Sequence, residues 1–321
     1  MSGARWSVGL AFAFLMALPG PTAAQAVDSL STRCVLAGGH PATCASAAVA
    51  ARAVVSQVGL MAGQGSEIPG EGSTLGRRLG GVPRVAAWVR GGVQPVGVPD
   101  PTDAGGPEEA SSWTPGVQAG LGLGIFDGFR LMPTVGGFLS LDAVGHASFL
   151  FLSDASGFDG RVDVVSVGAR VGILRESFTL PGVSVSVTRR FSGQVRLGDT
   201  SSGDASEVLV DPSVTSLRLT ASKDLFAFGL LAGLGWDDFS SDSEARLTDG
   251  AAGVVTTTGS FDGRRRLYFA SITKQLGILA WLTFEGGWAD GLDAVVGYGG
   301  STAFDPEQGA SFGSVSVLLK L

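Results

Sequence analysis

The chain has 321 residues, of which 45% are hydrophobic, only 16% are charged and 50 are glycine, and its mean hydropathy is +0.32. A chain of this composition is too apolar for an ordinary soluble domain and too rich in glycine for a helical one. Its formal net charge of −7 argues against a basic surface for the phosphate backbone, so we expect no nucleic-acid partner.

Residues 1–26 have the pattern of a secretory signal peptide. Arg5 supplies a short basic start, residues 8–18 are apolar, and small residues follow at two candidate cleavage sites, 22–24 and 24–26. The apolar core is shorter than the roughly 20 residues that a membrane-spanning helix needs. We therefore expect export followed by removal of this signal, with a membrane anchor as the less favoured alternative.

Cys34 and Cys44 are the only cysteines in the sequence. In an oxidising compartment two thiols this close in the chain are expected to pair, and their spacing is not that of a Cys-x-x-Cys redox motif. The sequence therefore predicts a structural disulfide. A thiol redox site and a metal site shared with His40 are less favoured alternatives.

A slim helix is predicted over residues 43–62. Small and apolar side chains recur there every three or four positions, at Ala47, Ala51, Val54, Val58 and Met61. Residues 65–80, which are rich in glycine, form a linker. Residues 27–80 are therefore expected to make a small helical region ahead of the main domain.

From residue 82 onward, apolar and polar residues alternate with the period of two that is typical of β-strands. In the stretch 183–196, for example, Val183, Val185 and Val187 share one face and Ser184 and Ser186 the other. This stretch is longer than the usual five or six residues of a strand in a globular protein. About ten such segments are predicted, at 82–96, 113–126, 136–152, 161–175, 182–198, 207–222, 225–240, 255–273, 277–289 and 309–321.

No apolar run in this region is long enough to span a membrane as a helix, since the longest, 225–236, holds about 12 residues. The other way to satisfy every backbone group in lipid is a closed β-barrel, whose tilted strands need only about 9 to 11 residues. The connections also alternate between long and short, with the long ones rich in acidic residues. We therefore predict a transmembrane antiparallel up-and-down β-barrel over residues 81–321, with about ten strands and with about eight or about twelve as alternatives. A soluble all-β sandwich is the competing interpretation.

The last predicted strand carries an apolar row, Gly313, Val315, Val317, Leu319 and Leu321, that ends at the final residue. Here the chain resembles the bacterial outer-membrane β-barrel proteins as a class, whose last strand is an alternating assembly signal, usually ending in an aromatic residue where this chain has Leu321. The resemblance covers roughly residues 82–321 and names no subfamily. It implies a place in the outer membrane of a Gram-negative-type envelope and recognition by the barrel-assembly machinery.

Such a barrel would contact the lipid bilayer. Its acidic loops could hold divalent cations near anionic outer-leaflet lipids or meet a partner. Residues 27–80 would then either plug the lumen or pack as a periplasmic helix under the rim. The oligomeric state stays open.

If the apolar rows face lipid, the other rows line the lumen, and arginine dominates them. The lumen-lining candidates are Arg170, Arg190, Arg196, Arg218 and Glu285, with Arg84, Arg90, Gln118, Asp142 and Arg266 on the same rows. A polar interior of this kind either conducts small solutes or is locked by ion pairs. Our first expectation is a narrow channel or transporter for small polar solutes, and the alternative is a closed structural or surface-interaction barrel. No cofactor and no metal site is expected.

His146 and Ser148 form a His-x-Ser pair on the third predicted strand. The pair resembles that of outer-membrane phospholipases and lipid A deacylases, which would make Ser148 the nucleophile and His146 its base in a lipid hydrolase. The chain contains no asparagine to orient the base, and the pair lies on the lumen row, whereas those enzymes direct it to lipid. Asp142 is about 13 Å from His146 along a strand. We therefore expect no enzymatic activity.

Overall fold

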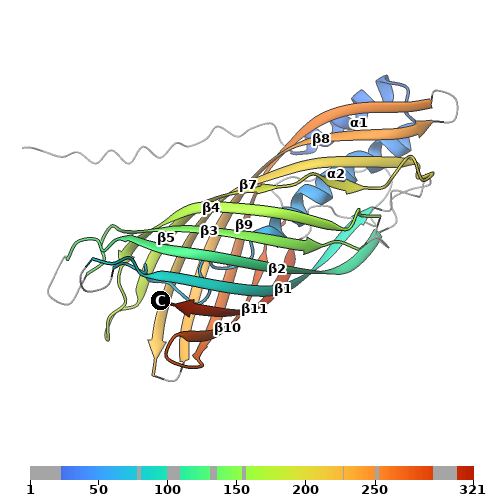
Figure 1. Ribbon diagram of the computed structural model, residues 1–321. Helices are drawn as coiled ribbons and strands as arrows, with labels where there is room; N and C mark the ends of the chain where they lie inside the picture. Colours follow the sequence, from blue (N-terminus) through green and yellow to red (C-terminus); the bar gives the residue numbers. More distant parts are fainter. Residues whose placement is uncertain are drawn as a thin grey trace, which may run out of the picture.

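The computed structural model describes residues 23–77, 81–99, 109–130, 136–153, 157–226, 228–249, 253–291 and 309–321. The strands form one antiparallel sheet in the order β5-β4-β3-β2-β1-β11-β10-β9-β8-β7-β6, and pairing of β5 with β7 closes it into a barrel (Figure 1). Both β5 and the short β6 pair with β7, so they share one position in a wall of ten strands. The predicted barrel of about ten strands is confirmed, and the sandwich is not.

Two helices, α1 (Ala23–Leu36) and α2 (Pro41–Ala62), precede the barrel. The strands are β1 (Val85–Pro99), β2 (Glu109–Phe126), β3 (Ser140–Phe151), β4 (Arg161–Leu174), β5 (Gly182–Ser192), β6 (Val195–Leu197), β7 (Ser206–Leu225), β8 (Phe228–Asp249), β9 (Gly253–Gln275), β10 (Ala280–Ala289) and β11 (Ala310–Lys320). The first strand of the barrel pairs with the last, as closure requires.

The period-two alternation separates an apolar exterior from a polar interior. On the exterior, Leu121 is 63% exposed and Val167 is 54% exposed, whereas Gln118 and Ser166 on the other face are buried. A continuous band of exposed apolar side chains around a closed barrel would be unfavourable in water. Such a band is typical of the surface that contacts lipid hydrocarbon. The exterior is therefore the lipid-contacting face.

The two rows of β9 could not be told apart from the sequence, and the structure separates them. Tyr268 and Ile272 are exposed on the lipid side, while Leu267 and Phe269 are buried in the interior. The expected loop at 241–254 is wrong, because β8 continues to Asp249 and β9 begins at Gly253. In this region the outward-facing residues of β8 are polar, because they lie beyond the apolar band. A strand with polar outward-facing residues has a composition similar to that of an acidic loop.

The barrel has two different ends. We call the end that carries Leu321 and the short connections the turn end, and the opposite end, where β7, β8 and β9 rise beyond the other strands, the loop end (Figure 1). α1 packs against α2 and β9 at the loop end. α2 is the one described helix long and apolar enough to cross a membrane, but 89% of its most apolar stretch is buried inside the protein. It is the core of the barrel.

Candidate functional site: the threaded lumen

The N-terminal segment runs through the barrel from one end to the other. α2 enters at the loop end and contacts β7, β1, β8 and β3, and residues 63–77 continue toward the turn end. There the main-chain N–H of Arg77 donates to Asp127, in the connection after β2, at 2.6 Å. The sequence left two locations open for this segment, and the structure places α2 and the residues after it in the lumen.

The upper half of the lumen is apolar and holds only α2. Its residues Ala47, Ala51, Val54 and Val58 are at most 1% exposed. They share one core with inward-facing wall residues, among them Val96, Leu150, Val164, Val210, Val214 and Phe239. Gly59 lies so close to the ring of Phe239 that no side chain would fit between helix and wall. The small residues let a helix about 10 Å across fit inside the barrel.

Closer to the turn end, arginines of the wall bind the main chain of the segment. Three wall arginines donate to carbonyl oxygens near or just after the end of α2, at 2.6–2.9 Å: Arg265 to Ser56, Arg218 to Gly63 and Arg90 to Gln64. Gly63 is the C-cap of α2, and carbonyls at a helix end lack partners within the helix and carry its negative dipole end. All three arginines bind main-chain oxygens, so the contacts do not need a particular side chain on the segment.

A buried ionic cluster joins the segment to the wall at mid-height. Glu67 of the segment accepts hydrogen bonds from Arg190 Nη2 at 2.9 Å and from Thr188 at 3.0 Å. Asp237 of β8 accepts from Arg218 Nη1 at 2.6 Å and lies 3.9 Å from Arg190 Nη1. Arg190 therefore stands between one carboxylate of the segment and one of the wall.

Two further carboxylates of the wall bind the main chain of the segment. Glu285 accepts from the N–H of Ser66 at 3.2 Å and from its hydroxyl at 2.6 Å. Asp142 pairs with Arg170 at 2.9 Å and accepts from the N–H of Leu75 at 2.9 Å. The segment is thus held at several levels by both signs of charge.

The buried charges of the lumen do not balance by themselves. Among the described residues here, the arginines at most 5% exposed are Arg52, Arg90, Arg170, Arg190, Arg218 and Arg265, against the carboxylates Glu67, Asp142, Asp237 and Glu285. An unpaired buried charge costs several kcal/mol. Carbonyl oxygens of the threaded segment accept from the wall arginines Arg90, Arg170, Arg218 and Arg265, so the segment supplies acceptors that the wall lacks. Arg52 of α2 donates in turn to the carbonyl of Asp262 in the wall.

At the turn end the segment is tied by exposed polar groups. Burial raises the pKa of Asp127, but the N–H of Arg77 and the guanidinium of Arg175 outweigh it, and the pKa of Asp127 is lowered. Glu71 pairs with Lys320 near the end of the last strand. These contacts hold the segment across the mouth of the barrel.

Two small cavities lie between the segment and the wall. One measures about 20 Å³, beside Gln64 and Arg90, and the other about 10 Å³, beside Val58 and Arg190. Space of this size holds about one water molecule. A larger cavity of about 630 Å³ opens at the turn end and is lined in part by residues 71–75. The segment therefore fills the lumen at both of the levels where the small cavities lie.

Four of the five predicted lumen residues, Arg170, Arg190, Arg218 and Glu285, are buried in the protein. Arg196 is a correction, because its side chain is 43% exposed and lies 3.6 Å from Glu207. The chain breaks its alternation between β5 and β6, so the residues on either side of Arg196 turn inward instead.

On β9 the predicted lumen residue Arg266 is exposed, and its neighbour Arg265 is buried in the lumen instead. Asp237 was not among the predicted lumen residues, yet it is fully buried beside Arg218. Glu67 was missed altogether. Its signal was a carboxylate in the glycine-rich linker, which also carries Glu71, in a chain whose barrel rows are rich in arginine.

The residues of the hydrolase alternative do not form a triad. His146 and Ser148 are both buried, but Ser148 accepts from Gln118 at 3.2 Å, and the ring of His146 faces Glu67 at 3.9 Å. Asp142 is engaged by Arg170. The threaded segment also covers the pair, so no substrate reaches it in this state.

Comparison with known proteins gives the following similarities. No family model and no curated protein matches the sequence. Among solved structures, the chain is similar to the translocator domain of the autotransporter NalP from Neisseria meningitidis, with 14% identity, a TM-score of 0.41, and 74% of this chain and 88% of that chain covered.

The outer-membrane protease OmpT from Escherichia coli has 10% identity and a TM-score of 0.41, with 74% and 96% covered. The transport unit of the autotransporter AIDA-I from Escherichia coli has 10% identity and a TM-score of 0.35, with 73% and 89% covered. These proteins differ in activity, and the assignment of the fold rests on the strand pairing of this chain.

Proposed function

We propose that this protein is an outer-membrane β-barrel that its own N-terminal segment keeps closed, and that anchors the first helix of that segment at the outer surface. In this proposal residues 1–26 are a cleaved signal peptide, residues 27–80 the segment, and residues 81–321 the barrel. The loop end faces outward and the turn end faces the periplasm, as in barrels with short periplasmic turns.

The observation that carries the proposal is the path of the segment. It fills the lumen along its length, with gaps of only about 20 Å³ and about 10 Å³ between segment and wall. Each level has its own contacts, from the apolar core around α2 to the buried clusters of Glu67 and Glu285. A barrel that only conducts solutes would not need so many contacts between its wall and the main chain of the segment.

Conductance in planar lipid bilayers tests the closure. The intact protein should stay closed, and a variant lacking residues 27–80 should conduct if it folds, as judged by its altered gel mobility before boiling. Since that deletion removes the acceptors of several arginines, Glu67→Gln serves as a milder variant and should show brief openings. Steady conductance of the intact protein would refute the closed state.

Surface anchoring is tested separately with an epitope tag placed just ahead of residue 27. On intact cells an antibody should reach this tag. A tag that is reached only after the outer membrane is permeabilised would show that the segment enters from the other end.

A second candidate is a channel that opens when the segment leaves, and the charge of the wall favours it. The wall alone carries Arg90, Arg170, Arg190, Arg218 and Arg265 against Asp142, Asp237 and Glu285. An emptied lumen would therefore favour small anions. Replacing Arg170, Arg190 and Arg218 with glutamine in the truncated form should weaken that preference, measured as the reversal potential in a salt gradient.

A further inference from the structure

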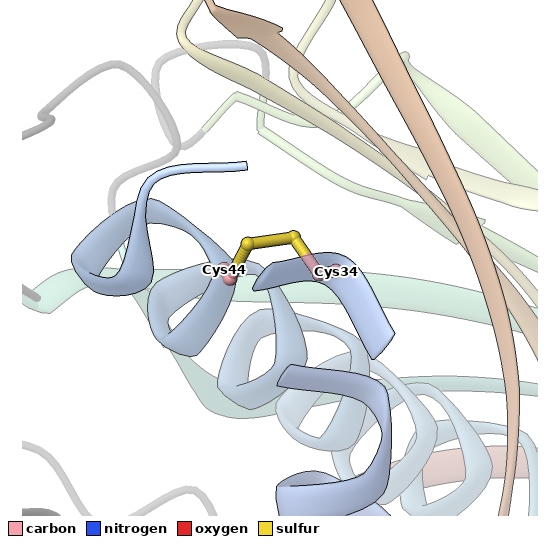
Figure 2. The surroundings of a disulfide bond; sticks show 2 residues. All are labelled: Cys34 and Cys44. Atoms are coloured by element: carbon pink, nitrogen blue, oxygen red, sulfur yellow. A yellow bond between two sulfur atoms is a disulfide. The ribbon is translucent and has the colours of Figure 1, made fainter. Parts of the chain in front are cut away.

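The two helices of the N-terminal segment form a hairpin that is closed by a disulfide. Cys34, near the end of α1, is bonded to Cys44, in the first turn of α2, with their Cα atoms 5.6 Å apart (Figure 2). Both cysteines are at most 1% exposed, and Gly39 in the connection lies against the two sulfur atoms. The predicted disulfide is confirmed, and it holds the two helices side by side.

Only one arm of this hairpin lies along the lumen. α2 contacts four strands of the wall, whereas the main contacts of α1 are with α2 and β9. Leu30 of α1 packs on Gly259, close to the tip of β9 at the loop end. α1 therefore lies against the extended strands at the loop end, outside the part of the lumen that α2 fills.

The lumen has room for one helix and not for two. Packed helices lie about 8–10 Å apart, so a pair spans about twice the width of a single helix. Two cavities beside α2 measure only about 20 Å³ and about 10 Å³, and the helix packs directly on the wall at Gly59 and Phe239. A folded hairpin cannot pass where its single arm already fills the space.

We propose that the Cys34–Cys44 disulfide makes the hairpin a stopper, which prevents the N-terminal segment from being drawn through the barrel toward the turn end. Without the bond, α1 can swing about the glycines at 38 and 39 into line behind α2 and follow it through the lumen. With the bond, Cys34 stays beside Cys44 and the hairpin cannot open into a line. The noncovalent contacts in the lumen keep the segment in place. The disulfide prevents the segment from leaving through the turn end.

This inference rests on the proposed position of the segment and is tested by trapping its N-terminus. Protein biotinylated at a short tag ahead of residue 27 is inserted into a planar bilayer, and streptavidin is added to the turn-end chamber. Low urea, at which the barrel keeps its unboiled gel mobility, loosens the lumen contacts. The protein with its disulfide should close again after urea removal. Cys34→Ser/Cys44→Ser should become trapped open, because streptavidin binds the emerged tag and blocks its return.

Two controls separate the stopper from the lumen contacts. Glu67→Gln with the disulfide intact should open more often but should never be trapped. The unaltered sequence treated with a thiol reductant during the urea step should behave like the double serine variant, and it tests the bond without a folding defect. Equal trapping with and without the disulfide would overturn the stopper. If streptavidin in the loop-end chamber fails to bind the untreated protein, the proposed function fails instead.

Discussion

Arg218 and Asp237 lie on the neighbouring strands β7 and β8 with 2.6 Å between Nη1 and Oδ1, and both side chains are completely removed from solvent. The same guanidinium donates through Nη2 to the carbonyl of Gly63 at 2.9 Å. One arginine thereby connects a wall carboxylate with the threaded segment. The stability of the wall and the retention of the segment are coupled through this residue.

Replacing Asp237 with alanine should therefore destabilise the barrel by about 3–5 kcal/mol, because it leaves Arg218 buried beside no carboxylate. The measurement is the urea midpoint for loss of the unboiled gel mobility. The adjacent Asp238→Ala is the matched control. Its pair with Arg264 is more than half exposed on both sides, and its loss should change stability by about 1 kcal/mol or less. Equal effects of the two substitutions would contradict a special role for the buried pair.

The position of the membrane edge on β8 can be tested with one strand and one face. Leu234 and Ser240 both point outward, but Leu234 lies in the apolar band and Ser240 on the rising extension. Leu234→Arg should cost about 2–4 kcal/mol if the residue lies near the bilayer midplane. Ser240→Arg should be tolerated, with folding yield in lipid vesicles as the readout. Similar yields for the two variants would mean that the apolar band is not the lipid contact.

Gly59→Ala should loosen the segment, because the new methyl group would meet the ring of Phe239. Overpacking of this kind typically costs about 1–3 kcal/mol. The expected readout is an increase in brief openings in planar bilayers. Phe239→Leu, which removes part of the ring, should suppress the effect in the double variant. If the two substitutions simply add, Gly59 and Phe239 are not in contact across the lumen.

The tie at the turn end should depend on pH. The lowered pKa of Asp127 means that its contribution is present above the usual aspartate value, about 4, and is lost as pH falls through the lower folded value. Hydrogen exchange of the peptide containing the Arg77 amide, corrected for intrinsic rates, should stay slow at neutral pH and accelerate only in strong acid. Asp127→Asn should exchange faster throughout. Protection that is independent of both pH and this substitution would exclude the proposed tie.

The wall of the barrel could be predicted from the sequence because residues along a strand of a membrane barrel alternate between an apolar outer face and a polar inner face. Leu121 and Gln118, for example, are separated by parity alone. Arg196 was placed wrongly because the alternation breaks between β5 and β6. Asp237 keeps the inward parity of β8, which continues unbroken to Leu247, so parity alone would have placed it in the lumen.

The location of the segment was not predictable for a different reason. A helix of small residues such as α2 fits a barrel lumen and an ordinary helix interface equally well, and nothing local distinguishes the two. The choice depends on the carbonyls near Gly63 meeting Arg218, a contact between positions 155 residues apart. A contact of that kind leaves no pattern in the residues that accept it, since every residue carries a carbonyl.

The same main-chain grip has a consequence for how this chain can diverge. Arg90, Arg218 and Arg265 hold oxygens that remain in place whatever side chain is attached to residues 64, 63 and 56, within the limits of space. Mutations at these three positions can therefore accumulate without releasing the segment, provided that the backbone keeps its course. The arginines of the wall have no such freedom. Sequences descended from a common ancestor should keep those arginines while residues 56, 63 and 64 vary.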